Sequence, residues 1–129
     1  MPRSYAVDSE GGVEMSQGSP SAEAIGPLEA QALIEAGAHL IDVREPQEWE
    51  AGRAPQARHI PLGDLQQRLG EIPFDQTVVF VCHGGGRSGR ATQAFGDLGY
   101  RAINLAGGMV AWQDAGLPVI ANSGPGTVV

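Results

Sequence analysis

The sequence is short of several residue types and patterns, and each shortage excludes a class of protein. It holds one cysteine in 129 residues, so no internal disulfide can form and nothing points to an oxidising compartment. Basic residues are few, 8 against 15 acidic ones, and the net charge of -7 argues against nucleic-acid or anionic-membrane partners. No uninterrupted apolar run approaches the roughly 20 residues that a transmembrane helix needs.

The chain is also too short for two domains of ordinary size, although 129 residues are enough for a real core. Its start is polar throughout and lacks the basic-then-apolar layout of a secretory signal. The composition predicts a disordered tail over 1–22, one domain over 23–120 and a flexible tail over 121–129. We therefore expect a cytoplasmic, monomeric protein with no membrane segment and no nucleic-acid partner.

Within the domain, apolar residues recur at two spacings. Short, bulky apolar runs predict strands at residues 25, 39–43, 58–62, 77–81 and 100–105. Helical spacing predicts helices at 27–36, 63–70, 88–99 and 108–116. Strands that read as unbroken apolar runs and alternate with helices are typical of a parallel sheet covered on both faces. The predicted fold class is α/β.

The single thiol follows the strongest strand, in the stretch "VVFVCHGGGRSGR". Cys82 is thereby placed at the carboxyl end of a buried strand, where open α/β sheets bind ligands. In the loop after it, glycines let successive N–H groups face one centre, and the next helix adds its positive N-terminus near Ser88. Arg87 adds a charged planar donor. Such surroundings favour the thiolate, which is the nucleophilic form.

Other interpretations of these residues are weaker. A lone cysteine is usually an inert buried side chain, but a run of three glycines is a poor choice for stability alone. Gly84, Gly86 and Gly89 satisfy a dinucleotide fingerprint, yet no acidic residue follows at the required distance, and a P-loop lysine is missing too. The three histidines, at 39, 59 and 83, are scattered, so the sequence predicts no metal site and no cofactor.

Three segments in order resemble the rhodanese family. They are "LIDVREPQEWEAGRAPQARHIPL" (40–62), "VCHGGGRS" (81–88) and "INLAGGMVAWQDAGLPV" (103–119). The middle segment is similar to the family's active-site loop, Cys-x4-Arg-Ser/Thr. The resemblance implies a three-layer α/β/α domain with a central five-stranded parallel sheet. It also implies sulfur transfer from a donor such as thiosulfate to cyanide or a thiol, through a cysteine persulfide.

The resemblance further implies roles for particular residues. Cys82 is the expected nucleophile, and the substrate-binding loop is expected to consist of His83, Gly84, Gly85, Gly86, Arg87 and Ser88. Asp42 and Arg44 are expected to support the site, with Arg44 paired to Glu45 or Glu48. The implied partners are a small-molecule or protein sulfur donor and a thiol acceptor. Whether His83 tunes the thiol or faces solvent stays open.

The chain departs from the family pattern beside the site, where "GRAPQARHIP" carries Arg53, Ala54, Gln56 and His59 at changed positions. Two alternatives to sulfur transfer remain. Cysteine-dependent phosphatases also use a thiolate and an arginine, but their loop has five residues between the two, and here there are four. The second alternative is a binding or redox-sensing module built on the same scaffold.

Overall fold

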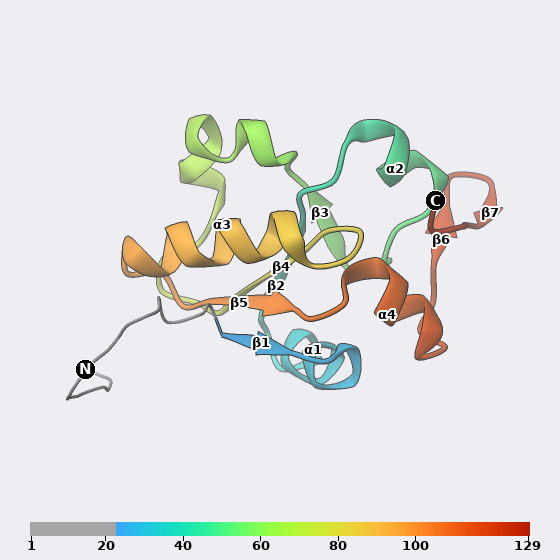
Figure 1. The fold of residues 1–129 in the computed structure, drawn as a ribbon, viewed down its shortest axis with the longest axis horizontal. Coiled ribbons are helices and arrows are strands. Elements are labelled where there is room, and N and C mark those ends of the chain that lie inside the picture. Colours follow the sequence, from blue (N-terminus) through green and yellow to red (C-terminus); the bar gives the residue numbers. More distant parts are fainter. Residues whose placement is uncertain (1–22) are drawn as a thin grey trace.

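Five short strands form a parallel sheet in the spatial order β1-β5-β4-β2-β3 (Figure 1). The structure is a computed structural model that describes residues 23–129. The strands are β1 (Ala24–Ile25), β2 (His39–Asp42), β3 (Ala57–His59), β4 (Val78–Val81) and β5 (Ala102–Leu105). The central strand β4 is buried along its whole length, as expected for an unbroken β-branched run covered on both faces. The predicted five-stranded parallel sheet is confirmed.

Helices cover both faces of this sheet (Figure 1). They are α1 (Pro27–Glu35), α2 (Pro46–Ala51), α3 (Gly86–Asp97) and α4 (Gly108–Asp114). Pro27 opens α1, because its missing N–H and fixed φ suit the first turn, and the Glu29 side chain accepts a hydrogen bond from the Gly26 amide at 3.3 Å. The predicted helices at 27–36 and 108–116 are confirmed, and α3 begins two residues earlier than expected.

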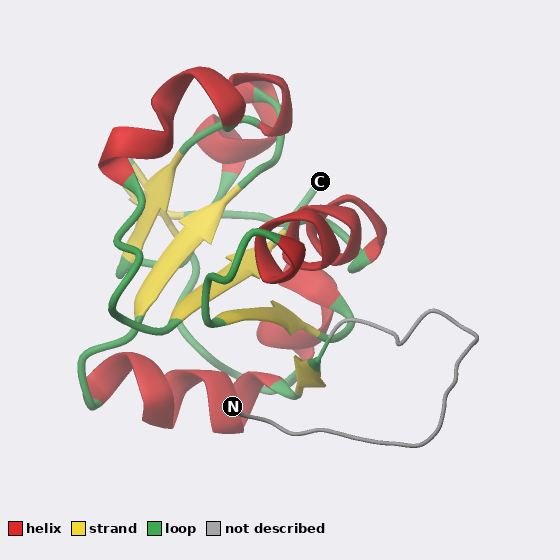
Figure 2. Ribbon diagram, turned by 90° about the vertical axis from the view of Figure 1, so that its left-hand side faces the viewer, coloured by secondary structure: helices red, strands yellow, loops and turns green. Residues whose placement is uncertain are grey.

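The two faces of the sheet carry two separate apolar clusters, which make the three layers. Alternate residues of a strand point to opposite faces, so neighbours in β4 join different clusters. Val78 and Phe80 pack with Phe95 of α3, whereas Val79 and Val81 pack with the helices α1 and α4. Figure 2 shows helices on either side of the strands. The sheet therefore lies between two layers. One layer consists of α3 and residues 62–72, and the other consists of α1 and α4.

Two helical segments differ from the expectation. The segment at 63–70 is not an α-helix but two 3₁₀ turns, η2 (Leu62–Asp64) and η3 (Gln66–Glu71), with non-helical dihedral angles at Arg68. So short a stretch between two glycines gains too few i→i+4 hydrogen bonds to offset helix nucleation. Helix α2, which the sequence did not predict, is short too, and the Glu48 side chain closes its N-terminus by accepting the Glu45 amide at 2.9 Å.

The C-terminal residues differ from the flexible tail expected over 121–129. They form an antiparallel pair, β6 (Ile120–Ala121) and β7 (Gly124–Pro125), and continue back toward α2. Thr127 donates its amide to the Ala51 carbonyl at 2.9 Å, and Val128 packs on the cluster under α4. Gly52 makes this possible, because a Cβ there would lie 2.4 Å from the Thr127 carbonyl oxygen. The C-terminal segment thus braces the end of α2.

The predicted disordered tail over 1–22 lies outside the described residues. Among residues 23–129, no helix has both the length and the apolar character that crossing a membrane requires.

Candidate active site

Cys82 lies directly after β4, at the carboxyl edge of the sheet, with only 1% of its surface exposed. Two hydrogen-bond donors lie within reach of its sulfur, one in the loop that follows and one in the first turn of α3. The Gly85 amide lies 3.1 Å from Sγ, and the Ser88 hydroxyl lies 3.3 Å from it. The loop therefore curls around the thiol, as the glycine-rich sequence indicated, and presents donors to the sulfur.

Of the three consecutive glycines, only Gly85 needs to be glycine for its backbone conformation. Its φ of +110° belongs to the left-handed region that side chains rarely adopt, and this residue is the N-cap of α3. Gly84 and Gly86 have ordinary φ angles, and a Cβ on either would meet nothing within 4 Å. Neither the backbone conformation nor the packing of the fold therefore requires glycine at these two positions.

Two opposing influences set the protonation of the thiol. Burial raises the pKa of Cys82, and this is the largest single effect. The Ser88 hydroxyl and the backbone amides of Ser88, Gly85 and Arg87 act in the other direction by donating to the charged sulfur. Together these donors outweigh burial, so the pKa of the thiol lies below its ordinary value. The site favours the thiolate.

A half-buried amide on the neighbouring strand holds these donors in place. Asn104, on β5, donates from Nδ2 to the Gly85 carbonyl at 3.1 Å, and its Oδ1 accepts from the Ser88 hydroxyl at 2.6 Å. Because a hydroxyl has one proton, Ser88 donates either to Asn104 or to the sulfur. Sequence reasoning did not single out Asn104, although a lone amide in the apolar strand "AINL" is a signal.

The start of α4 fixes the loop from the other side. The amides of Met109 and Val110 donate to the carbonyls of Cys82 and His83, at 2.8 and 3.1 Å. This close approach requires Gly108, which has φ +62° and whose absent Cβ would lie 2.4 Å from both carbonyl oxygens. Gly108, the second glycine of the Gly-Gly pair in the third family segment, therefore lets α4 hold the cysteine loop, a role that the motif alone did not reveal.

The guanidinium of Arg87 forms an ion pair with a carboxylate of the chain. Its Nη1 and Nη2 atoms donate to Oε1 and Oε2 of Glu48, at 2.9 and 3.0 Å. The Arg87 guanidinium lowers the pKa of Glu48 to about 2, against the opposing effect of burial, with help from the Glu45 amide and Arg44. The same hydrogen bond raises the pKa of Arg87. Glu48 thus forms a forked ion pair with the loop arginine.

Arg44 does not pair with Glu45 or Glu48, so this expectation is wrong. Its partner is Asp42, two residues earlier, whose Oδ2 lies 2.8 Å from Nη2, and both side chains are fully buried. The side chains of residues i and i+2 point to the same side of an extended chain. Arg44 also donates to the Gly52 carbonyl at 2.6 Å, which ties the end of β2 to the end of α2. The expected supporting role of this pair stays a prediction.

The histidines have different surroundings. His59 is half-buried: its ring nitrogen Nε2 lies 2.7 Å from the Arg44 carbonyl oxygen, and the ring stacks on Trp49 with 4.8 Å between ring centroids. Arg53 lies over the same Trp49 ring at 4.9 Å. Two of the positions that depart from the family pattern thus share one aromatic ring. His83 keeps a buried Nδ1 with no hydrogen-bond partner in the described part of the chain.

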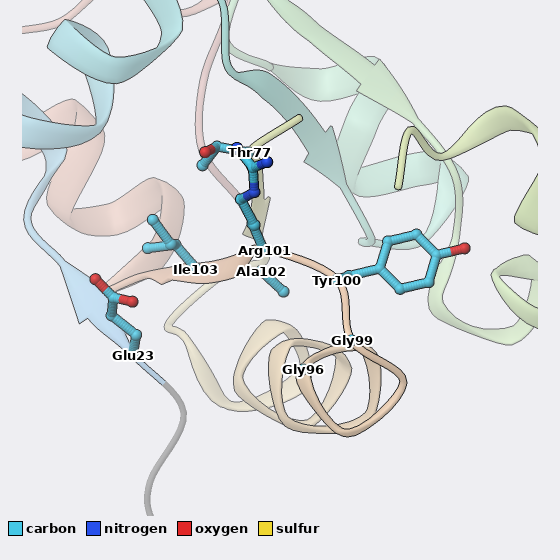
Figure 3. Close-up of a pocket in the computed structure, with 8 residues that line it drawn as sticks. All are labelled: Glu23, Thr77, Gly96, Gly99, Tyr100, Arg101, Ala102 and Ile103. Carbon is cyan, nitrogen blue, oxygen red and sulfur yellow. The ribbon is translucent and has the colours of Figure 1, made fainter. Parts of the chain in front are cut away.

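A pocket of about 620 Å³ lies away from the thiol (Figure 3). It is lined by Glu23, Thr77, Gly96, Gly99, Tyr100, Arg101, Ala102 and Ile103. Thr77 and Arg101 directly precede β4 and β5, whereas Cys82 directly follows β4, so the pocket and the thiol lie at opposite edges of the sheet. Among the described residues, no group of three or more His, Cys, Asp or Glu side chains is placed to hold a metal ion.

The thiol has a lowered pKa and lies at the carboxyl edge of a parallel sheet, in a loop whose N–H groups donate to it. The protein therefore belongs to the class of α/β domains built around an ionisable cysteine. Residues 26–115 match the family described as the rhodanese-like domain, and the chain belongs to that family. The resemblance read from the three sequence segments is confirmed.

Individual proteins of known name are similar to this chain, and two of them are named sulfurtransferases. A sulfurtransferase of Allochromatium vinosum is 41% identical over 86 residues, which cover 66% of this chain and 80% of the relative. Thiosulfate sulfurtransferase GlpE of Vibrio cholerae is 35% identical over 95 residues, 72% of this chain and 90% of that protein. The crystal structure of a rhodanese-related protein from Thermoplasma volcanium has a TM-score of 0.71 at 28% identity, covering 76% of this chain and 97% of that one.

Proposed function

We propose that this protein is a sulfurtransferase that carries a sulfane sulfur on Cys82 as a persulfide. The observation that carries the proposal is the donor set around Sγ, from Gly85 and Ser88, which lowers the pKa of the thiol. Membership of the rhodanese-like family and the sulfurtransferase names of its relatives support the same reaction.

The first half-reaction loads the cysteine. With thiosulfate as donor, the Cys82 thiolate attacks the outer sulfur and a new S–S bond forms. The S–S bond of thiosulfate breaks, and sulfite leaves with the electron pair. The backbone N–H groups that donate to the Cys82 sulfur stabilise the thiolate, and the same groups are the nearest donors available to a persulfide anion.

The second half-reaction returns the thiolate. An acceptor nucleophile, either a thiolate or cyanide, attacks the outer persulfide sulfur, and the bond to Cys82 Sγ breaks with its electrons left on Sγ. The products are an acceptor persulfide or thiocyanate. The thiolate supplies both the nucleophile and the leaving group, so the proposed reaction draws on no metal or cofactor. The proposed setting is the cytoplasm, where thiols stay reduced.

The phosphatase alternative has less support. Four residues separate Cys82 from Arg87, one fewer than in the phosphatase loop, which leaves a smaller ring for a tetrahedral phosphate. Both terminal nitrogens of Arg87 are also bound to Glu48, rather than presented to the three equatorial oxygens of a phosphoryl group. Thiosulfate–cyanide transfer should therefore exceed aryl-phosphate hydrolysis, which should stay at background.

Mass spectrometry of the intact protein tests the proposal. After incubation with thiosulfate, the protein should gain the mass of one sulfur atom, and cyanide or a thiol reductant should remove it. Cys82→Ser, which retains a side chain of similar size, should gain nothing. If no donor adds sulfur to the wild type, the binding-module interpretation is preferred.

A further inference from the structure

The pairing of Arg87 changes what the site offers to a donor. A free guanidinium presents parallel N–H groups that bind an oxyanion through two hydrogen bonds. Here the Glu48 carboxylate accepts both of these bonds, from Nη1 and Nη2 of Arg87. A donor oxyanion that uses the same geometry must compete with a carboxylate that is part of the chain.

The second arginine near the site is neutralised as well. Arg44 is fully buried against Asp42, and this ion pair has no net charge. The positive potential at Cys82 therefore comes mainly from the loop amides and from the N-terminus of α3, which begins at Gly86. These groups stabilise one negative charge on the sulfur, and Glu48 offsets the positive charge of Arg87.

We propose that Glu48 is a donor-selecting residue: by holding both terminal nitrogens of Arg87, it weakens the use of dianionic donors such as thiosulfate and favours sulfane sulfur carried on a thiol persulfide. The inference rests on the proposed sulfur transfer and adds to it the class of donor.

The charge balance of the two loading reactions explains the selection. When the thiolate attacks thiosulfate, a monoanion meets a dianion, and a persulfide anion and a sulfite dianion result. When it attacks the outer sulfur of a protonated persulfide, R–S–SH, the new bond to Sγ forms while the S–S bond of the donor breaks. The electron pair leaves on RS⁻, and the proton stays on the transferred sulfur. A single negative charge is present throughout, so this reaction depends far less on a free cation.

The side chain of Glu48 can be changed without undoing its local structure. It is partly exposed, with 18% of the side-chain surface accessible, and its Oε1 caps α2 by accepting the Glu45 amide. Glutamine keeps an amide oxygen for that cap and removes the charge. Glu50 supplies a matched control, because it is an exposed glutamate on the same helix.

The experiment compares the second-order rate constants for loading Cys82 from two donors, read by mass spectrometry. The donors are thiosulfate and the hydropersulfide of 2-mercaptoethanol, which bears at most one negative charge. Glu48→Gln should raise the thiosulfate rate relative to the persulfide rate by about five- to 25-fold, since one exposed charge pair changes an equilibrium by up to about fivefold and the factors for the two charges of thiosulfate multiply. Most of the change should appear in KM. Glu50→Gln should alter the ratio by less than about twofold.

Glu48→Asp separates the holding of Arg87 from the charge itself. The shorter side chain keeps its negative charge but cannot reach both nitrogens, so the ratio should still rise, by less than in Glu48→Gln. An unchanged ratio in Glu48→Gln, an equal rise in Glu50→Gln, or no rise in Glu48→Asp overturns the inference and leaves sulfur transfer intact. If the wild type is loaded by neither donor, the proposed function fails and the inference fails with it.

Discussion

Replacing Gly108 by alanine should destabilise the protein strongly, because two costs coincide there. The residue has φ +62°, and alanine in the left-handed region costs roughly 1–2 kcal/mol. The new Cβ would also lie 2.4 Å from the carbonyl oxygens of Cys82 and His83, so one backbone segment must move. Forcing extra volume into a packed site costs roughly 1–3 kcal/mol more.

Together these costs reduce the free energy of unfolding by roughly 2–5 kcal/mol. In a domain of about 100 residues, 1 kcal/mol corresponds to a shift of about 4 °C or more in Tm, so Gly108→Ala should melt about 8–20 °C below the wild type. The measurement is thermal unfolding followed by circular dichroism at one pH and protein concentration.

Two further glycines separate the contributions. Gly116 has φ +80° but nothing within 4 Å of an added Cβ, so Gly116→Ala should show the conformational cost alone, roughly 1–2 kcal/mol. Gly96 is exposed within α3 and has an ordinary φ, so Gly96→Ala should stabilise the protein by roughly 0.5–1 kcal/mol. If Gly108→Ala melts no lower than Gly116→Ala, the close approach of α4 to the cysteine loop is refuted.

Three other results are expected. Ser88→Ala removes a donor to Sγ and should raise the pKa of Cys82, so the alkylation rate should rise with pH later than in the wild type; a coincident profile would contradict the role of the hydroxyl. Because the folded state lowers the pKa of Cys82, the linked stability is present at high pH and is lost as pH falls through the folded pKa, and Ser88→Ala should reduce it. Cys82→Ser should abolish transfer and leave Tm nearly unchanged, whereas a collapsed fold would assign the thiol to packing. Deleting 122–129 removes the hydrogen bonds of Gly126 and Thr127 and the packing of Val128, so unfolding should cost about 2–3 kcal/mol less; an unchanged Tm would mean that this segment braces nothing.

The central layer of the fold could be predicted because it depends on local sequence. The strands β2 and β4 are buried on both faces, so their residues form short, bulky apolar runs. Such runs, here at 39–43 and 77–81, can be recognised as strands from the sequence. Helix α2 could not be predicted in the same way. It has six residues, none of them buried, and its Glu48 is held by Arg87, 39 positions away. Tertiary contacts stabilise such a helix, and a single sequence does not display them.

The same distinction applies to the site. The thiol, its glycines and the helix after them are consecutive, so their arrangement follows from the order of residues. The ion pairs involve a choice among several nearby acids. Arg44 pairs with Asp42 rather than Glu45, because the side chains of residues i and i+2 of an extended chain point to the same side. Asn104 and Gly108 act on the loop across the sheet edge, and only the parallel alignment of β4 with β5 brings them there.

The donors that stabilise the Cys82 thiolate also make it more sensitive to oxidation. The thiolate is the form that peroxides attack, and the first product is a sulfenic acid, which a neighbouring thiol normally converts to a disulfide. This chain has no second cysteine. An oxidised Cys82 must therefore be rescued by a thiol from another molecule before it proceeds to the irreversible sulfinic acid. Stored without reductant, the protein should lose its titratable thiol steadily while its fold and its melting curve remain intact.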